Sequence, residues 1–460
     1  MLNGYSREDA MQIAKRLCEF LVETKFKDIP KETVEFTKQL GLKTVAGMLN
    51  GSKRPAGRRI ASFIKDQGSP SEASLIGSGF KSSVEKANFA NGIFAHACEL
   101  EDDQFPSATS DILIFPILFP LAEKLRSSGG QLIEAAALSM EVMNRVGMYS
   151  LAHTGIADLS FYGIIGSAAA AGKMLGLNPT QLYSAFGIAL GRASGFLVNF
   201  GTDAHYLESA MAGRDGFLAA IFAKNGMTGN GDLEKWMTGL FSAPRPQFEK
   251  IIENLGKPRW HVHNMWIKKY PCCFLTHRHN DATFALLKEN RVPYDKVERI
   301  DIDIGPVDGV TDRPNPKDEE DARFSIQHIQ AGILLEGDLN FNTFTEEKIH
   351  SPLFKEIRSR VKVHVHEDWP AKMMSGTAKV TLTTKDGRSF SKEMEQPLGG
   401  SDLPLTNQEF KEIYYKLTKG ILSEDQMEWT CKTLLNLEEI DDLQELMEIL
   451  TYGHAAGRKG

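Results

Sequence analysis

Apolar residues recur at helical spacing through the first half of the chain. Residues 5–50 predict two helices, the second opened by Pro30, and residues 83–225 predict one helix after another. Small residues are dense at 163–172 and 187–195. Because these glycines lie inside apolar helical runs, close helix–helix packing explains them better than phosphate binding, which needs a preceding strand. This half therefore predicts an all-helical domain.

The pattern changes after Trp260. Residues 297–304, 361–365 and 378–384 alternate between apolar and polar, as strands do, and the turn signal Lys385-Asp386-Gly387-Arg388 predicts a hairpin after the third. Residues 323–335 predict a helix between the strands. From Thr406, a predicted N-cap with Glu409 three residues on, the chain is helical again, with an amphipathic helix at 437–450.

The fold class that follows is mainly α: a large all-helical domain with an inserted smaller α+β lid domain. The predicted boundaries place residues 1–267 and 400–460 in the helical domain and residues 268–399 in the lid domain. The C-terminal helices are expected to return to the first domain.

Composition narrows the class of protein. The 460 residues carry a net charge of −7, which leaves no basic surplus for a nucleic-acid partner. The longest apolar run, 112–122, is too short to span a bilayer and contains two prolines, and no signal peptide opens the chain. The five cysteines form no CxxC spacing, so neither a disulfide framework nor a zinc site is indicated. We expect a cytoplasmic protein without a membrane partner.

The stretch 94–110 carries the strongest candidate chemistry. It holds four carboxylates in five positions: Glu99, Glu101, Asp102 and Asp103. If it is the end of a helix, His96, Glu99 and Asp103 share one face and Glu101 points elsewhere. A solvated acidic helix end is the alternative, but acidic groups oppose the negative end of the helix dipole and the flanks are apolar. Crowded carboxylates raise each other's pKa, which suits acid–base catalysis.

A series of short motifs runs along nearly the whole chain. Each is weak alone, and they are Ala90-Asn91-Gly92, Ala95-His96-Ala97, 163–171, Leu175-Gly176-Leu177, Arg214-Asp215-Gly216, Lys268-Lys269-Tyr270-Pro271-Cys272-Cys273 with Thr276-His277, Phe324-Ser325-Ile326 and 385–388. Their order and spacing together resemble the MmgE/PrpD family, which includes 2-methylcitrate dehydratase, cis-aconitate decarboxylase and iminodisuccinate epimerase. The resemblance implies a helical domain with an α+β lid, a homodimer, and no metal or organic cofactor.

The resemblance also implies a catalytic set whose residue types differ from the family pattern. Glu99 stands at the family's first catalytic Asp and Asp103 at its Thr, while His205 replaces a Lys and His328 replaces a Tyr. All four replacements are ionisable and suit proton transfer. We expect Glu99, Asp103, His205 and His328 to converge in one cleft between the two domains.

Further residues are candidates for binding substrate. Thr109 falls at the family's first His and His153 at its second, while Lys268, His277 and Arg278 predict a positive patch that could clamp a carboxylate. A solvated helix start is the alternative for that patch. The adjacent Cys272 and Cys273 predict packing rather than a nucleophile.

Two functions remain open from the sequence. The first is a cofactor-independent lyase or isomerase that removes a proton next to a carboxyl or carbonyl group of a small carboxylate. The pocket is less positive than the family pattern, which predicts a substrate other than a tricarboxylate. Elimination, decarboxylation and epimerisation all remain possible outcomes. The second is a non-catalytic paralogue that keeps the fold and the dimer.

Overall fold

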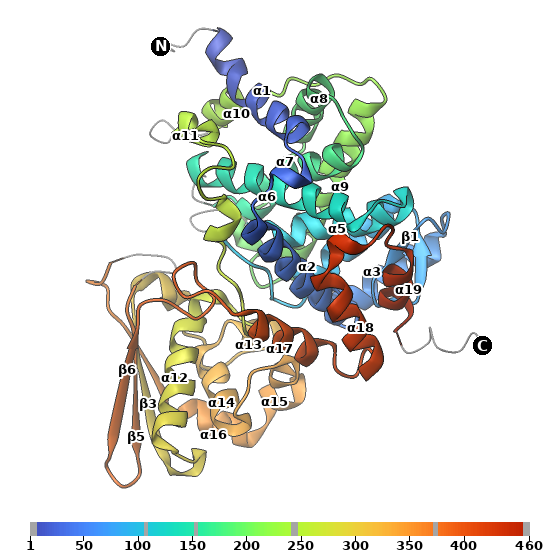
Figure 1. Cartoon of the computed structure of the whole chain (residues 1–460). Helices are drawn as coiled ribbons and strands as arrows, with labels where there is room; N and C mark the ends of the chain where they lie inside the picture. Colours follow the sequence, from blue (N-terminus) through green and yellow to red (C-terminus); the bar gives the residue numbers. More distant parts are fainter. Residues whose placement is uncertain (1–6, 105–108, 151–154, 241–246, 371–375, 454–460) are drawn as a thin grey trace, which may run out of the picture. The chain divides into compact units, whose positions relative to one another are not determined.

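The computed structural model describes residues 7–104, 109–150, 155–240, 247–370 and 376–453. The chain divides into two compact units (Figure 1). The first, here called the helical unit, comprises residues 1–265 and 406–460, and the second, the mixed unit, comprises residues 266–405. The sequence predicts 1–267 with 400–460, and 268–399, for the corresponding domains.

In its described residues, the helical unit consists of α-helices, short 3-10 helices and one small hairpin. Its helices are α1 (Arg7–Glu23), α2 (Lys31–Gly51), α3 (Pro55–Gln67), α4 (Val84–His96), α5 (Asp111–Leu125), α6 (Gly129–Ser150), α7 (Asp158–Met174), α8 (Pro179–Leu190), α9 (Asp203–Lys224), α10 (Leu233–Leu240), α11 (Phe248–Ile252), α17 (Asn407–Thr418), α18 (Glu424–Leu435) and α19 (Gln444–Tyr452). The hairpin pairs β1 (Ala73–Leu75) with β2 (Phe80–Ser82) in antiparallel fashion. The C-terminal helices α17 and α18 pack on α2.

Small residues let the central helices of this unit approach closely. A Cβ atom on Gly166 of α7 would come 2.7 Å from Met143 Sδ of α6, and one on Gly216 of α9 would come 2.5 Å from Ser167 Cβ of α7. These glycines lie inside helices, and no side chain fits at either contact. The packing role that the sequence predicts is confirmed for the small residues of 163–172. At 187–195 it is not, because α8 ends at Leu190 and Gly187 meets the backbone of residues 229–230, which lie outside any helix.

The mixed unit is built on a four-stranded sheet of order β4-β3-β5-β6. The strands are β3 (Val297–Ile304), β4 (Val361–Val365), β5 (Ala378–Thr384) and β6 (Ser389–Met394). The pair β3–β4 is parallel and the other pairs are antiparallel. The helices are α12 (His277–Asn290), α13 (Glu319–Arg323), α14 (Ile326–Glu336), α15 (Glu346–His350) and α16 (Pro352–Ser359). The helices α12, α14 and α16 lie beside the sheet (Figure 1). Their apolar side chains pack with those of the strands into one core.

The predicted strands and hairpin are confirmed, and two predicted helices are interrupted. The helix predicted at 323–335 is split into α13 and α14 because Ser325 leaves the helical conformation and caps α14 by accepting from His328 N. The helix predicted at 437–450 is also split. A short 3-10 turn at 437–439 precedes α19, where Asp442 accepts from the backbone N–H of Gln444 at 3.0 Å. Aspartate competes with the helix backbone in this way at caps and turns.

The fold class, mainly α with a smaller α+β part, is confirmed. Thr406 and Glu409 form the predicted capping box of α17. Within the described ranges, every helix is too short or too polar to cross a membrane.

Candidate active site

Two histidines meet where α4 and α9 pack together in the helical unit. A Cβ atom on Gly92 of α4 would lie 3.1 Å from Ala210 Cα of α9, so this glycine sets the close approach of the two helices. His96 is the last residue of α4 and His205 lies in the first turn of α9. Their ring centroids are 4.5 Å apart at an interplanar angle of 65°. Both side chains are buried.

The proton on the His96 ring can be placed from its neighbours. Ser209 Oγ donates its single proton to the carbonyl oxygen of Tyr206 at 3.0 Å, because a carbonyl oxygen can only accept. Ser209 Oγ must then accept from His96 Nδ1–H at 2.8 Å. In its neutral form the ring therefore carries its proton on Nδ1, and Nε2 is its acceptor nitrogen.

The acidic stretch does not continue α4. The helix ends at His96, the Glu99 backbone N–H donates to His96 O at 3.0 Å, and Glu99 has the left-handed φ of 53°. The expectation that His96, Glu99 and Asp103 share one helical face is therefore wrong. Three further carboxylates at the negative end of α4 would oppose its dipole, and the chain leaves the helix before them.

The turn that carries the four carboxylates (residues 99–103), here called the acidic turn, brings together a different set of side chains. His96, Glu99 and Glu101 each offer one ligand atom, and these atoms lie within 4.8 Å of one another. All three residues are buried, with relative exposures of 0, 2 and 7%. The sequence placed Glu101 away from Glu99, because it assumed helical spacing, and this expectation is also wrong.

A buried ion pair holds the turn in place. Lys43 of α2 donates to the Asp102 carboxylate and to the carbonyl oxygen of Leu100, and neither side chain of the ion pair is exposed. The backbone N–H of Asp102 donates to Asp111 Oδ1 at 3.0 Å, which ties the turn to the start of α5.

The Asp111 carboxyl has a raised pKa in this arrangement. Burial, and after it the charge of Asp102, raises its pKa to about 8, although Lys43 opposes the shift. The hydroxyl of Thr44 lies 2.8 Å from Leu40 O and 3.1 Å from Asp111 Oδ2. If its single proton goes to the carbonyl, which can only accept, a protonated Asp111 donates to Thr44 Oγ1.

Asp103 and Thr109 face each other across the same stretch. Their backbones form an isolated antiparallel bridge, and Thr109 Oγ1 donates to the Asp103 carboxylate. Asp103 is half-buried, unlike its acidic neighbours. These two predicted site residues are thus brought together.

His205 lies between an apolar ring and a carboxylate. The ring centroid of Phe200 is 4.2 Å away, and His205 Nδ1 lies 3.8 Å from Glu208 Oε2, within ion-pair range but too far for a hydrogen bond. Burial raises the pKa of Glu208, but the contacts to His205, Asn199 and the Phe196 backbone outweigh it and the pKa is lowered. Glu208 is therefore ionised beside His205 at neutral pH.

His328 in the mixed unit has different surroundings. Its Nε2–H donates to Thr343 O at 2.8 Å, and its Nδ1 accepts from Arg358 Nη1 at 3.1 Å. Burial lowers its pKa to about 4. Both ring nitrogens are used within the core of the mixed unit, so His328 is neutral, fixed and poorly suited to proton transfer at neutral pH.

The predicted positive patch of the mixed unit is buried, and its Arg278 is paired with a carboxylate. Lys268, His277, Arg278 and His279 are at most 2% exposed, so the solvated helix start is wrong. Burial, with the charge of Arg278 in addition, lowers the pKa of His279 to about 3. His277 stacks on Phe274 with ring centroids 4.6 Å apart.

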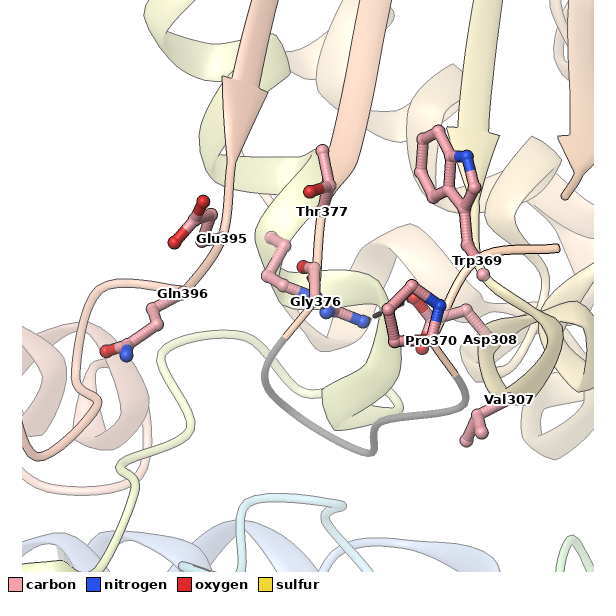
Figure 2. A pocket seen from close by; sticks show the side chains of 10 residues that line it. Val307, Asp308, Trp369, Pro370, Gly376, Thr377, Glu395 and Gln396 are labelled. Atoms are coloured by element: carbon pink, nitrogen blue, oxygen red, sulfur yellow. Dashed lines mark hydrogen bonds and ion pairs between the residues drawn. The ribbon is translucent and has the colours of Figure 1, made fainter.

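Arg278 lines a cavity of about 380 Å³ in this unit. Figure 2 shows Trp369, Thr377 and Glu395 around the cavity. The Arg278 guanidinium pairs with the Asp308 carboxylate and donates to Gly376 O at 2.5 Å. The positive charge of Arg278 is therefore already paired within the unit, which weakens the predicted carboxylate clamp.

One predicted site residue, His153, lies outside the described residues. Several other residues of the site could not be predicted from the sequence. Cys272 and Cys273 are buried and not joined in a disulfide, and Cys272 packs in a core cluster, as predicted. No recognisable sequence motif contains Lys43, Asp111 or Ser209. They come close to the acidic turn only in the folded chain.

Comparison with known proteins adds independent information. The model of the MmgE/PrpD N-terminal domain matches residues 15–248, and that of the MmgE/PrpD C-terminal domain matches residues 270–437. The chain is 28% identical over 382 residues to a human cis-aconitate decarboxylase, covering 79% of each protein. It is 27% identical over 473 residues to a cis-aconitate decarboxylase-like protein of Aspergillus oryzae, covering 95% of this chain and 97% of the relative. A cis-aconitate decarboxylase of Aspergillus terreus is 25% identical over 471 residues, with 95% and 96% covered.

Proposed function

Because the chain belongs to the MmgE/PrpD family, we propose that it is a lyase that removes a proton next to a carboxyl or carbonyl group of a small carboxylate. Its relatives named cis-aconitate decarboxylase support lyase chemistry on a carboxylate. The proposed step needs an acid and a base of suitable pKa and no organic cofactor.

The observation that carries this proposal is the contact of His205 with His96 at the head of the acidic turn. In our proposal His205 accepts the substrate proton, and ionised Glu208, 3.8 Å from its Nδ1, stabilises the imidazolium that forms. Asp103, held by Thr109, and Glu99 are the carboxyl groups that can return a proton. We leave His328 out of this set because both its ring nitrogens have partners.

We propose a substrate with fewer carboxylates than cis-aconitate. The described part of the acidic turn holds Glu99, Glu101, Asp102 and Asp103, and the lysine that the structure places there, Lys43, is paired with Asp102. A tricarboxylate needs several Arg or Lys donors to offset its charge. His205, at the family's Lys position, offers at most one.

The backbone of Glu99 favours catalysis over a non-catalytic paralogue. A non-glycine residue in the left-handed region costs roughly 1–2 kcal/mol, and such conformations cluster at functional sites. Glu99 keeps a large side chain at a φ of 53° in the middle of the cluster. In a non-catalytic paralogue, nothing would offset the free-energy cost of keeping a glutamate in this backbone conformation.

A substrate screen tests the proposal. The purified protein is incubated with a panel of small hydroxy, keto and unsaturated mono- and dicarboxylates, and loss of water or CO₂ is followed by mass spectrometry. We expect turnover of at least one compound, lowered about 10²–10⁴-fold in His205→Asn and retained in His350→Asn, a control histidine with a side chain 60% exposed on α15. Turnover at the wild-type rate in His205→Asn would remove the proposed base.

We also propose a homodimer that buries an apolar surface beside the site. Large apolar side chains are exposed around the 3-10 turn 197–199 and on α9: Phe196, Leu197, Val198, Phe200, Leu207 and Met211. Phe200 contacts His205, so a partner on this surface would cover the base. Light scattering should give twice 51.1 kDa for the wild type, and Val198→Asp, at an 87% exposed position, should shift the protein to monomer. We further propose a cytoplasmic location, because the five cysteines are buried and form no disulfide.

A further inference from the structure

The 3-10 turn 197–199 and the residue before it hold the carboxylate that faces the proposed base. Asn199 Nδ2 donates to Glu208 Oε1 at 2.5 Å, and the backbone N–H of Phe196 donates to the same oxygen at 3.1 Å. Hydrogen bonds to a carboxylate are stronger than those between neutral groups. The other oxygen, Oε2, lies 3.8 Å from Nδ1 of His205. The two oxygens of Glu208 therefore have separate partners, the turn on one side and the imidazole on the other.

Asn199 differs from its neighbours in this stretch. The apolar residues of 196–200 are exposed, whereas Asn199 is half-buried. The backbone already closes the turn, because the Asn199 N–H donates to Phe196 O at 3.1 Å and the Thr202 N–H donates to Asn199 O at 3.1 Å. The hydrogen bond of the Asn199 side chain to Glu208 is therefore an addition to a turn that the backbone forms by itself.

The place of the Glu208 carboxylate bears on which nitrogen of His205 carries the proton. Nδ1 of His205 and Oε2 of Glu208 are both buried, and neither has a hydrogen-bond partner among the described residues. A negative charge beside Nδ1 favours the proton on that nitrogen, which leaves Nε2 as the acceptor of the neutral ring. At 3.8 Å the two atoms are just beyond hydrogen-bond range. A small movement of the carboxylate therefore decides whether it can orient the ring.

We propose that Asn199 is a positioning residue, which holds Glu208 so that Oε2 faces Nδ1 of His205 and Nε2 is left to accept the substrate proton. The inference rests on the proposed function, in which His205 is the base. When the proton moves from the substrate carbon to Nε2, the electron pair of the broken C–H bond stays on the substrate. The ring becomes an imidazolium with a proton on each nitrogen, and Glu208 stays ionised and stabilises that charge.

A double-variant cycle on kcat tests the inference with a compound that the substrate screen identifies. Asn199→Ala should lower kcat by about tenfold to 10²-fold, the cost of misplacing a group in the site, and should leave KM nearly unchanged. Glu208→Gln keeps the side-chain shape and should lower kcat at least as far. In the Glu208→Gln background, Asn199→Ala should have little further effect, because residues that act as one unit are not additive.

Thr202→Ala is the matched control in the same turn. The Thr202 hydroxyl donates to Asn199 O at 2.7 Å, so its removal loosens the turn without taking a donor from Glu208. We expect the wild-type kcat in this variant. Urea denaturation checks that each variant is folded. If Asn199→Ala is not, Asn199→Asp decides the matter, because it keeps the side-chain shape, loses the donor and should lower kcat as Asn199→Ala does.

Three results would overturn the positioning role: the wild-type kcat in Asn199→Ala, an equal loss in Thr202→Ala, or losses of Asn199→Ala and Glu208→Gln that multiply in the double variant. His205→Asn separates this inference from the proposed function. Turnover that is slowed in His205→Asn but not in Asn199→Ala would leave the base standing and remove the positioning residue. Turnover at the wild-type rate in His205→Asn would remove the base, and the positioning role with it.

Discussion

Two histidines, one in each unit, are predicted from the sequence to be catalytic, and their surroundings differ. His328 donates to Thr343 O and accepts from Arg358, so each nitrogen has a fixed partner and burial keeps the ring neutral. His205 stands against His96 and Phe200, with an ionised carboxylate 3.8 Å from Nδ1. An ionisable residue at a family position is therefore not enough for catalysis. The partners of each nitrogen decide whether it can exchange a proton.

The same contrast holds for the buried charges. In the mixed unit, Arg278 is neutralised by Asp308 in the wall of a cavity. In the helical unit, Lys43 is neutralised by Asp102, but the neighbouring Glu99 and Glu101 lie together with His96. The mixed unit uses its ionisable residues to fix its own core, whereas the helical unit collects them at one turn.

The largest effect on stability is expected at the ion pair that holds this turn. Lys43→Met leaves the Asp102 carboxylate fully buried without its cation, which typically costs about 3–5 kcal/mol. Urea denaturation of the helical unit should show this loss. The double variant Lys43→Met with Asp102→Asn removes both charges and should recover part of it. Equal stability of Lys43→Met and the wild type would mean that the turn is not anchored as described.

His328 should matter for folding and not for chemistry. His328→Leu leaves Thr343 O and the Arg358 guanidinium without their partner, and such unsatisfied buried groups cost about 1–3 kcal/mol. We expect a lower denaturation midpoint, with kcat per folded molecule unchanged. A fall in kcat as large as that of His205→Asn, at full folding, would restore His328 to the catalytic set.

Buried histidines should make the mixed unit sensitive to acid. His279 and His328 have ordinary pKa values of 6.5 that burial lowers to about 3 and about 4. Below pH 6.5 the two histidines therefore bind protons in the unfolded chain but stay neutral in the folded unit. Their contribution to stability is complete above pH 6.5 and is lost as the pH falls toward 4, by up to about 1.4 kcal/mol per pH unit for each group.

The variant that tests this slope is His279→Leu. Each ring nitrogen of His279 is buried and has no hydrogen-bond partner among the described residues. Between pH 7.5 and pH 5, the free energy of unfolding measured with urea should fall less steeply in the variant. The difference in slope should correspond to about one proton taken up on unfolding. Parallel curves for the two proteins would show that His279 does not stay neutral in the fold.

The smallest predicted effect concerns the backbone of Glu99. Glu99→Ala and Glu99→Gly lose the same carboxylate, but alanine is strained at a φ of 53° and glycine is not. The glycine variant should be more stable by about 1 kcal/mol. At Glu208, inside α9, the order should reverse because glycine is the poorer helix former. The same order at both positions would contradict the left-handed turn.

Most of the fold follows from local patterns. Strict alternation predicts β3 and β5, the Thr406–Glu409 box predicts the start of α17, and the glycines of α7 predict close packing. The splits at Ser325 and Asp442 are missed because a single polar side chain competes with the helix inside an apolar pattern.

The site is less predictable because its geometry depends on one backbone angle. The acidic stretch locates the region correctly, but helical spacing is the wrong rule once Glu99 turns left-handed. This change brings Glu101 to His96 and Glu99. The partners Lys43 and Ser209 lie 56 residues before and 110 residues after Glu99 in the numbering, and no local pattern connects them to it.

The central claim is that His205 exchanges a proton with a substrate held at the acidic turn of the helical unit. It is tested most directly by deuterium exchange in heavy water, measured by mass spectrometry on the compound that the wild type turns over. We predict that wild-type protein labels the carbon next to the carboxyl or carbonyl group. His205→Asn should bind the compound with similar affinity but label it about 10²–10⁴-fold more slowly, the usual contribution of a general base. Labelling at the wild-type rate in His205→Asn would contradict the account.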